Sequence, residues 1–138
     1  MNEFALVDGA RVLARLTGDV DVTAYGDSLQ PCGPEVTPQT HYYSGEAFVA
    51  LPAAPCGFCD FDYDALAWAP NVDKAMTALR ARRDRLLAAS DWYTLRATDR
   101  GAACDAAYLA YRQALRDLPA TCADPFNPQW PGAPACLG

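Results

Sequence analysis

The chain has little of what most catalytic, nucleic-acid-binding and membrane-spanning proteins need. It contains one histidine among 138 residues, and its 17 acidic side chains outnumber 11 basic ones, giving a net charge of −6. Because negative charge repels polyanions, nucleic-acid binding is not expected. No apolar run approaches the roughly 18 residues that a membrane span needs, and the start Met-Asn-Glu-Phe lacks a basic segment. We therefore expect no membrane insertion, no export signal and a cytoplasmic protein.

Catalytic motifs are equally scarce. The single histidine, His41, lies between Thr40 and Tyr42 with no nucleophile signature beside it, and no glycine-rich phosphate loop is present. A histidine without such partners is more often structural than catalytic. The sequence therefore predicts a protein that is not an enzyme, and a small Cys/His hydrolase or redox enzyme is the remote alternative.

The N-terminal half predicts short β-strands separated by turns. Three hairpins are expected where apolar runs flank turn residues, over residues 4–16, 42–51 and 58–68. In the first hairpin, Asp8-Gly9 suits a type I′ turn, which needs positive φ angles. Val20 and Val22 alternate with polar residues as in a further strand. Prolines make residues 30–39 a loop.

The C-terminal half predicts two helices. Asn71 suits a helix N-cap, and apolar residues follow it at helical spacing. Arg83 interrupts this first seam, and we expect its stem to pack there while its head finds an acid or the ring of Tyr108. Pro119 is expected to end the second helix. Two seams joined by a linker predict an antiparallel helical hairpin; the second seam consists of Cys104, Tyr108, Tyr111, Leu115 and Leu118.

Prolines recur at every third position near the C-terminus, at Pro125, Pro128, Pro131 and Pro134. Polyproline II has three residues per turn, so this spacing predicts an extended strap that carries Trp130 onto the helices. The expected fold class is α+β. Small antiparallel β-hairpins make up a domain over residues 1–70, and the two-helix hairpin with its Pro/Trp-rich strap makes up a second over residues 71–138.

Six cysteines are many for a reducing compartment. Cys56 and Cys59 have the spacing with which two thiolates hold one side of a zinc ion, and Cys32 and His41 can complete a four-ligand site. The alternative is that these residues are buried thiols or a disulfide pair. The redox state stays open, and no cofactor is expected unless these residues bind zinc.

Aromatic side chains are the best candidates for protein contacts, because such rings dominate interface hot spots. Tyr42, Tyr43 and Phe48 in the β half are the predicted partner-binding residues. Trp92, expected at the end of the first helix, and Trp130 are predicted to clasp the helical hairpin.

Five short elements occur in a fixed order in the last third of the chain. An Arg/Asp-rich helix over residues 82–85 runs into Leu86-Leu87 and then Ser90-Asp91-Trp92, and Tyr111 to Pro119 read Tyr-Arg-Gln-Ala-Leu-Arg-Asp-Leu-Pro before Trp130-Pro131. Over about residues 72–134 the chain thereby resembles the C-terminal domain of bacteriophage tail assembly chaperones, also called tail fibre assembly proteins.

The resemblance implies a non-enzymatic phage tail protein. It would bind tail fibre or other tail polypeptides in the cytoplasm of the bacterial host, shielding apolar or strand-edge surface during assembly. An oligomer within a tail assembly is compatible with this role. The alternative is a permanent component of the virion tail, such as a fibre-attachment or minor tail protein.

Overall fold

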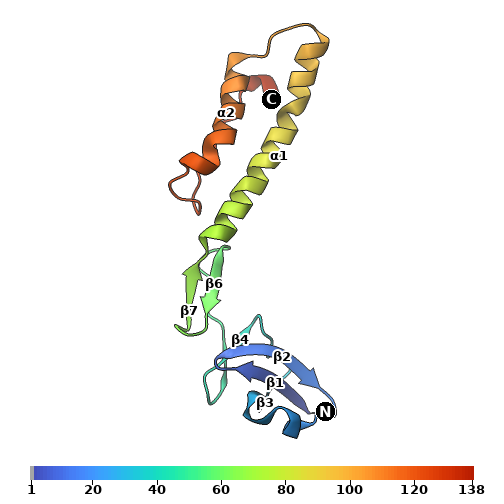
Figure 1. Cartoon of the computed structure of the whole chain (residues 1–138), viewed down its shortest axis with the longest axis vertical. Coiled ribbons are helices and arrows are strands. Elements are labelled where there is room, and N and C mark those ends of the chain that lie inside the picture. Colours follow the sequence, from blue (N-terminus) through green and yellow to red (C-terminus); the bar gives the residue numbers. More distant parts are fainter. Residues whose placement is uncertain (1) are drawn as a thin grey trace. The chain divides into compact units, whose positions relative to one another are not determined.

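The computed structural model describes residues 2–138, and the chain divides into two compact units, the first ending at Ala69 and the second spanning Pro70–Gly138 (Figure 1). Small antiparallel sheets make up the first unit and two helices the second, so the predicted α+β class is confirmed. Each unit has its own set of buried apolar side chains.

The first unit is built around a three-stranded antiparallel sheet with the strand order β2-β1-β3. β1 spans Glu3–Asp8, β2 spans Arg11–Thr17 and β3 spans Leu29–Pro31. Side chains alternate between two faces along a strand, so every second residue contributes to one apolar face. The buried core on this face consists of Ala5, Val7, Val12 and Val36.

The first predicted hairpin is confirmed, with its turn one residue further along than expected. Asp8 pairs with Arg11, so the two loop residues are Gly9 and Ala10. Gly9 has a φ of +57°, and Ala10 is not among the residues with positive φ. A glycine at the first loop position is what a type II′ turn requires, in place of the type I′ turn predicted.

The strand predicted around Val20 and Val22 is wrong. The segment forms two 3₁₀ turns, η1 at Val22–Ala24 and η2 at Gly26–Ser28. The carboxylate of Asp21 accepts hydrogen bonds from the backbone N–H of Thr23 at 3.0 Å and from its hydroxyl at 2.6 Å. Local side-chain bonds of this kind compete with strand pairing, and they turn the chain where alternation alone predicted an extended segment.

Gln30 and Pro31 were predicted to lie in the loop over residues 30–39, but they belong to β3. It pairs antiparallel with β1, with Leu29 opposite Leu6. Since β3 is an edge strand, the missing N–H of its proline leaves no neighbouring strand without a donor.

The other two predicted hairpins are confirmed. β4 (His41–Tyr43) pairs antiparallel with β5 (Phe48–Ala50). β6 (Cys59–Asp62) and β7 (Ala67–Pro70) form another two-stranded sheet. The carboxylate of Asp62 accepts from the backbone N–H groups of Asp64 at 2.9 Å and Ala65 at 3.0 Å, which fixes the turn after β6.

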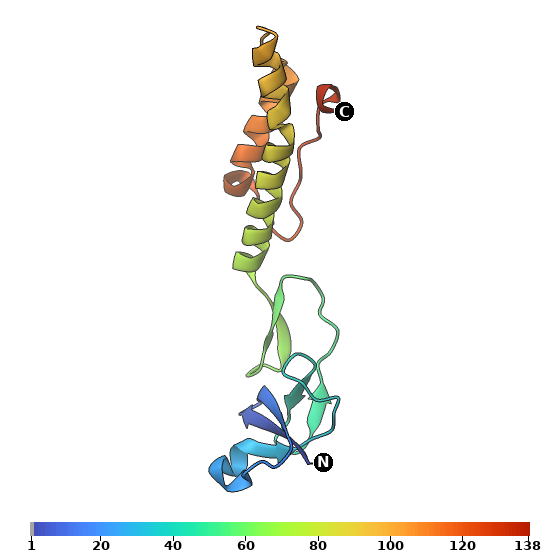
Figure 2. The ribbon, with the colours of Figure 1, turned by 90° about the vertical axis from the view of Figure 1, so that its right-hand side faces the viewer.

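The second unit contains α1 (Val72–Asp99) and α2 (Ala106–Thr121), then an extended segment ending in the 3₁₀ turn η3 (Ala135–Leu137). Asn71 caps α1 as predicted, its side chain accepting from the N–H of Lys74 at 3.0 Å. The two helices run side by side in opposite directions (Figures 1 and 2), which confirms the predicted helical hairpin. Within residues 2–138, neither helix combines the length and apolarity needed to cross a bilayer.

α1 continues to Asp99, so Trp92 lies within the helix and not at its end as predicted. Gly101, two residues after the last residue of the helix, has a φ of +63°. The N–H of Gly101 donates to the carbonyl of Thr98 at 3.0 Å, and the N–H of Ala102 donates to that of Ala97 at 2.9 Å. These two bonds form a Schellman motif, in which glycine takes the left-handed position just after the helix. Gly101 therefore ends the first helix.

α2 begins at Ala106, two residues after the Cys104 of its predicted seam, with Asp105 as its cap. Pro119 lies inside α2, so the prediction that it ends the helix is wrong. Proline removes one backbone donor, but its φ is compatible with a helix, and only two further helical residues follow it. The N–H of Cys122 still bonds to the carbonyl of Leu118 at 2.9 Å.

Candidate functional site

α1 and α2 meet around the fully buried side chain of Tyr108. Its hydroxyl donates to the main-chain carbonyl of Ser90 at 2.9 Å. A phenol has one hydrogen to donate, so the hydroxyl of Thr94, 2.5 Å away, is the donor in the second bond. The ring of Tyr93 packs against that of Tyr108 with a centroid distance of 4.5 Å. These contacts fix which positions of the two helices face one another.

Arg112 extends this network by one turn of α2. Its Nη1 donates to the carbonyl of Leu87 at 2.8 Å and to the hydroxyl of Ser90 at 2.6 Å, and it lies 2.8 Å from the carboxylate of Asp91. Ser90 is buried, and its hydroxyl in turn donates to Leu87 at 2.8 Å. Guanidinium presents several donors in a fixed fork, which suits it to a cluster of acceptors like this one.

Of the two partners expected for Arg83, an acid or the ring of Tyr108, the structure shows the acid. Arg83 is half-buried and pairs with its neighbour Asp84 at 2.7 Å. Arg112 instead lies over the Tyr108 ring, 5.7 Å from its centroid. Arg112 follows Tyr108 by four residues, the spacing at which side chains share a helix face, and that spacing was the available sequence signal.

Apolar side chains fill the rest of the interface. The predicted structural residues Tyr111, Leu115 and Leu118 of α2 are buried, at 7%, 0% and 7% exposure. They repeat at spacings of three and four, which places them on one stripe of the helix. The buried residues of α1 are Ala75, Leu79, Ser90 and Ala97.

A groove of about 540 Å³ lies beside this interface, between α1 and α2. Leu95 and Leu109 line it and are 66% and 54% exposed. Two arginines, Arg112 and Arg116, and one acid, Asp91, give it a small positive charge. The complete lining consists of Asp91, Thr94, Leu95, Cys104, Tyr108, Leu109, Arg112 and Arg116.

The extended C-terminal segment runs alongside α1 (Figure 2). The guanidinium of Arg82 lies 4.5 Å from the centroid of the Trp130 ring, a cation–π contact between α1 and this segment. Further along, Cys136 lies beside Tyr93. Desolvation, followed by the effect of the Cys136 thiol, raises the pKa of the Tyr93 phenol above its ordinary value. The packing of all four prolines along one edge stays a prediction.

Comparison with known protein families gives a match that lies in the helical unit. Residues 76–135 match the family model described as phage tail assembly chaperone protein. Over these residues the helical unit is similar to the phage tail assembly chaperone family. The match covers nearly all of α1, all of α2 and most of the extended segment, and it confirms the predicted resemblance. No curated protein and no solved structure matches the chain.

The helical unit leaves Trp92 partly exposed, so this ring is less enclosed than a clasp between the helices would make it. Trp92 is 43% exposed, and its ring packs edge-on against Tyr93 at 5.8 Å, with Arg96 6.0 Å from its centroid. It therefore leaves much of its indole in solvent, near the exposed Leu95.

The predicted partner-binding residues lie in the first unit, outside the tail assembly chaperone match. Tyr42, Tyr43 and Phe48 are half-buried. Tyr43 and Phe48 contact each other at 5.0 Å and pack against the core, while Tyr42 stacks on Phe61 at 5.7 Å. Part of each ring is thus used within the unit, and a binding role for the rest stays a prediction.

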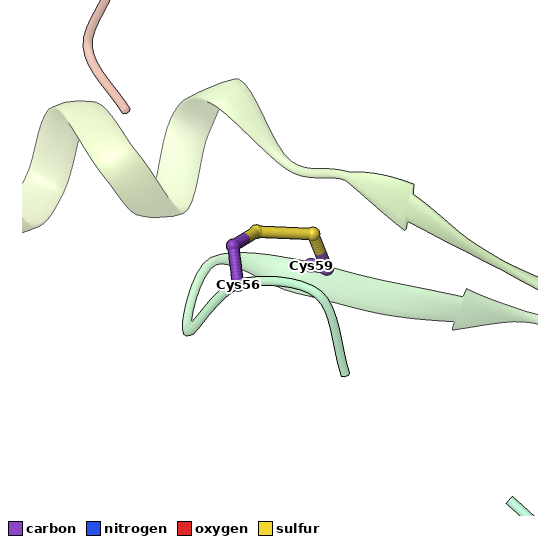
Figure 3. Close-up of a disulfide and its surroundings, with 2 residues drawn as sticks. All are labelled: Cys56 and Cys59. Atoms are coloured by element: carbon purple, nitrogen blue, oxygen red, sulfur yellow. A yellow bond between two sulfur atoms is a disulfide. The ribbon is translucent and has the colours of Figure 1, made fainter. Parts of the chain in front are cut away.

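The four candidate zinc ligands are not brought together. Cys56 and Cys59 form a disulfide, with Cα atoms 5.7 Å apart (Figure 3). Cys32 packs against the core of the first unit, and Nδ1 of His41 shares a 2.8 Å hydrogen bond with the hydroxyl of Thr40. Over the described residues, no three His, Cys, Asp or Glu side chains are grouped so as to hold a metal ion. The alternative interpretation, a disulfide pair, matches the structure.

Cys32 also has an environment that disfavours its thiolate. Desolvation, followed by the nearby carboxylate of Glu3, raises the pKa of the Cys32 thiol above its ordinary value. The thiolate is the form that binds metals and attacks substrates. Cys32 is therefore better suited to packing than to metal binding or nucleophilic chemistry.

Proposed function

We propose that the protein is a phage tail assembly chaperone that binds a tail fibre or another tail polypeptide in the cytoplasm of the bacterial host. The family match over residues 76–135 is the observation that carries the proposal. A chaperone of this kind works through binding energy alone, holding apolar or strand-edge surface of its client until the client assembles.

The helical unit supports this role with a rigid frame and an open apolar surface. Tyr108 and Arg112 tie α2 to α1 through hydrogen bonds. Beside them, Leu95 and Leu109 remain largely exposed, and Trp92 is partly exposed on the same helix as Leu95. Exposed apolar residues gathered around a groove are typical of a surface that binds another protein.

The first unit offers a second type of contact. β2 and β3 form the two edges of the three-stranded sheet, and edge strands can pair with an extended segment of another chain. In this proposal Tyr42, Tyr43 and Phe48 add aromatic contacts to the client.

Co-expression tests the proposal. The chain, carrying an affinity tag, is produced together with each tail polypeptide of the same phage. We expect one of them, a fibre polypeptide first of all, to co-purify with the chain and to gain soluble yield. If every tail polypeptide stays as insoluble without the chain as with it, and none co-purifies, the proposed function is wrong.

A permanent place in the virion tail is the second candidate, and the Cys56–Cys59 disulfide favours it. Disulfides persist in oxidising surroundings and are rare in a reducing cytoplasm, so a protein carried on a released particle is more suited to one. Mass spectrometry of purified particles separates the candidates. A retained component occurs in a fixed ratio to the tail proteins, whereas a dissociating chaperone is absent from the particle.

A further inference from the structure

We infer that the groove between α1 and α2 binds an amphipathic helix of the client, and that this helix carries acidic side chains. The inference rests on the proposed function and names the chemistry of the segment that is bound.

Apart from Cys104, which lies just before α2, the residues that line the groove belong to α1 and α2. α1 and α2 satisfy their N–H and C=O groups within each helix, so the groove has no strand edge with which an extended peptide can pair. A helix needs no backbone partner, and it packs its side-chain ridges into the space between two neighbouring helices. A helical occupant therefore fits the groove better than a strand does.

Exposed apolar side chains lie on both helices that border the groove. Leu95 projects from α1 and Leu109 from α2, and they are among the most exposed large apolar residues of the chain, at 66% and 54%. Trp92, one turn before Leu95, is 43% exposed. Because no residue of the described chain covers these side chains fully, an apolar stripe on a third helix would remove them from water.

The two arginines of the groove differ in their partners. Arg112 is half-buried and bonds to Leu87, Ser90 and Asp91. Arg116 is exposed, and within residues 2–138 it forms no ion pair. Arg112 therefore holds the helical hairpin together, whereas Arg116 presents an unpaired positive charge next to the exposed leucines. An acidic side chain of the client is the complementary group.

The same charge disfavours a second copy of this chain as the occupant. In a two-fold symmetric dimer formed through the groove, the groove of one copy faces the same groove of the other copy. Arg116 would then approach the partner's positively charged groove, and like charges across an interface are unfavourable. A different polypeptide with acidic residues meets no such repulsion.

Peptide scanning with the full-length chain tests the inference. The probes are overlapping synthetic peptides of about 20 residues, which span about 30 Å as a helix, covering the tail polypeptide identified by co-expression. We expect the bound peptides to be those that combine an apolar helical stripe with acidic residues. We further expect Arg116→Glu and Leu109→Ser each to weaken their binding about tenfold, equivalent to 1.4 kcal/mol.

Matched variants elsewhere serve as controls. Arg80→Glu makes the same charge change on the exposed side of α1, and Val22→Ser removes an apolar side chain of η1 that is 47% exposed in the first unit. Both should bind the peptides as the unaltered chain does. A peptide in which an acidic residue is replaced by lysine should regain affinity for Arg116→Glu.

Three outcomes would overturn the inference: bound peptides without acidic residues, groove variants that bind as well as the controls, or no bound peptide at all. Each can occur while the full-length client still co-purifies with the chain. In that case the groove assignment fails and the proposed function stands. Failure of the client itself to bind contradicts the proposed function.

Discussion

The hydroxyl of Tyr108 in α2 donates a hydrogen bond of 2.9 Å to the main-chain carbonyl of Ser90, in the interior of the 28-residue helix α1. A carbonyl inside a helix already accepts an N–H from its own helix, so this carbonyl uses its second lone pair for the neighbouring helix. The link is buried, and it joins one defined residue of each helix. It therefore does more than apolar packing to specify how the two helices are aligned.

Tyr108→Phe should lower the free energy of unfolding by about 1–2 kcal/mol, since it removes the buried hydroxyl and leaves the hydroxyl of Thr94 without its acceptor. Denaturant unfolding followed by circular dichroism measures the change. Leu109→Ala, on the next residue but 54% exposed, is the control and should alter the same quantity by less than about 0.5 kcal/mol. Equal effects of the two substitutions would contradict the role given to the hydroxyl.

Arg112→Ala should be more destabilising than Asp91→Ala. The arginine side chain is 13% exposed and bonds to Leu87, Ser90 and Asp91, so its loss removes several buried contacts and costs about 2–3 kcal/mol. Asp91 is 59% exposed, and an ion pair with an exposed partner contributes at most about 1 kcal/mol. Thermal unfolding of both variants tests the order, and a reversed order would contradict it.

Gly101→Ala should cost about 1 kcal/mol of unfolding free energy through the backbone alone. Gly101 has a φ of +63°, which alanine adopts only with strain, while a methyl group at this position would meet no atom within 4 Å. Gly132→Ala is the matched control, because its site is equally open and its φ is not in the left-handed region. The helix content at low temperature should stay the same in both variants. A Gly101→Ala protein as stable as the control would rule out the Schellman termination.

Thiol counting under denaturing, non-reducing conditions should find about four free thiols in the oxidised protein, since Cys56 and Cys59 are bonded and four of the six cysteines are free. Reduction should raise the count to six. Cys56→Ser should give five before and after reduction, because Cys59 then has no partner. Six reactive thiols in the unreduced protein, with zinc bound in an equimolar amount, would instead support the metal site considered from the sequence.

Local signals made much of the fold predictable. The hairpins have turn residues between apolar runs, and Asn71 combines a capping side chain with the helical spacing that follows it. Where a local signal was missed or ambiguous, the prediction failed. Asp21 can cap a turn or lie on a strand, and the first helix was expected to end near Trp92, whereas Gly101 terminates it further along the chain. Hydrogen bonds to Thr23 and Thr98 decide these cases.

The candidate site was much less predictable, because it depends on the alignment of α1 with α2. Seam spacing indicated that Tyr108 and Leu115 would be buried, and both are. It did not indicate which residues of α1 they would meet, so the ring of Tyr108 was one of two partners considered for Arg83, whereas Arg112 is the residue that lies over it. The groove lined by Leu95 and Arg116 arises from residues on different helices, and no spacing within one helix reveals it.

The most direct test of the account measures the soluble yield of the client tail polypeptide, co-expressed with the unaltered chain or with Tyr108→Asp. Aspartate at this buried position should separate α2 from α1, because an unpaired charge there is strongly unfavourable, while the sheets of the first unit are left unchanged in sequence. We predict that the unaltered chain keeps the client soluble and that Tyr108→Asp does not. Equal client solubility with both chains would contradict the claim that the helical hairpin is needed to bind the client.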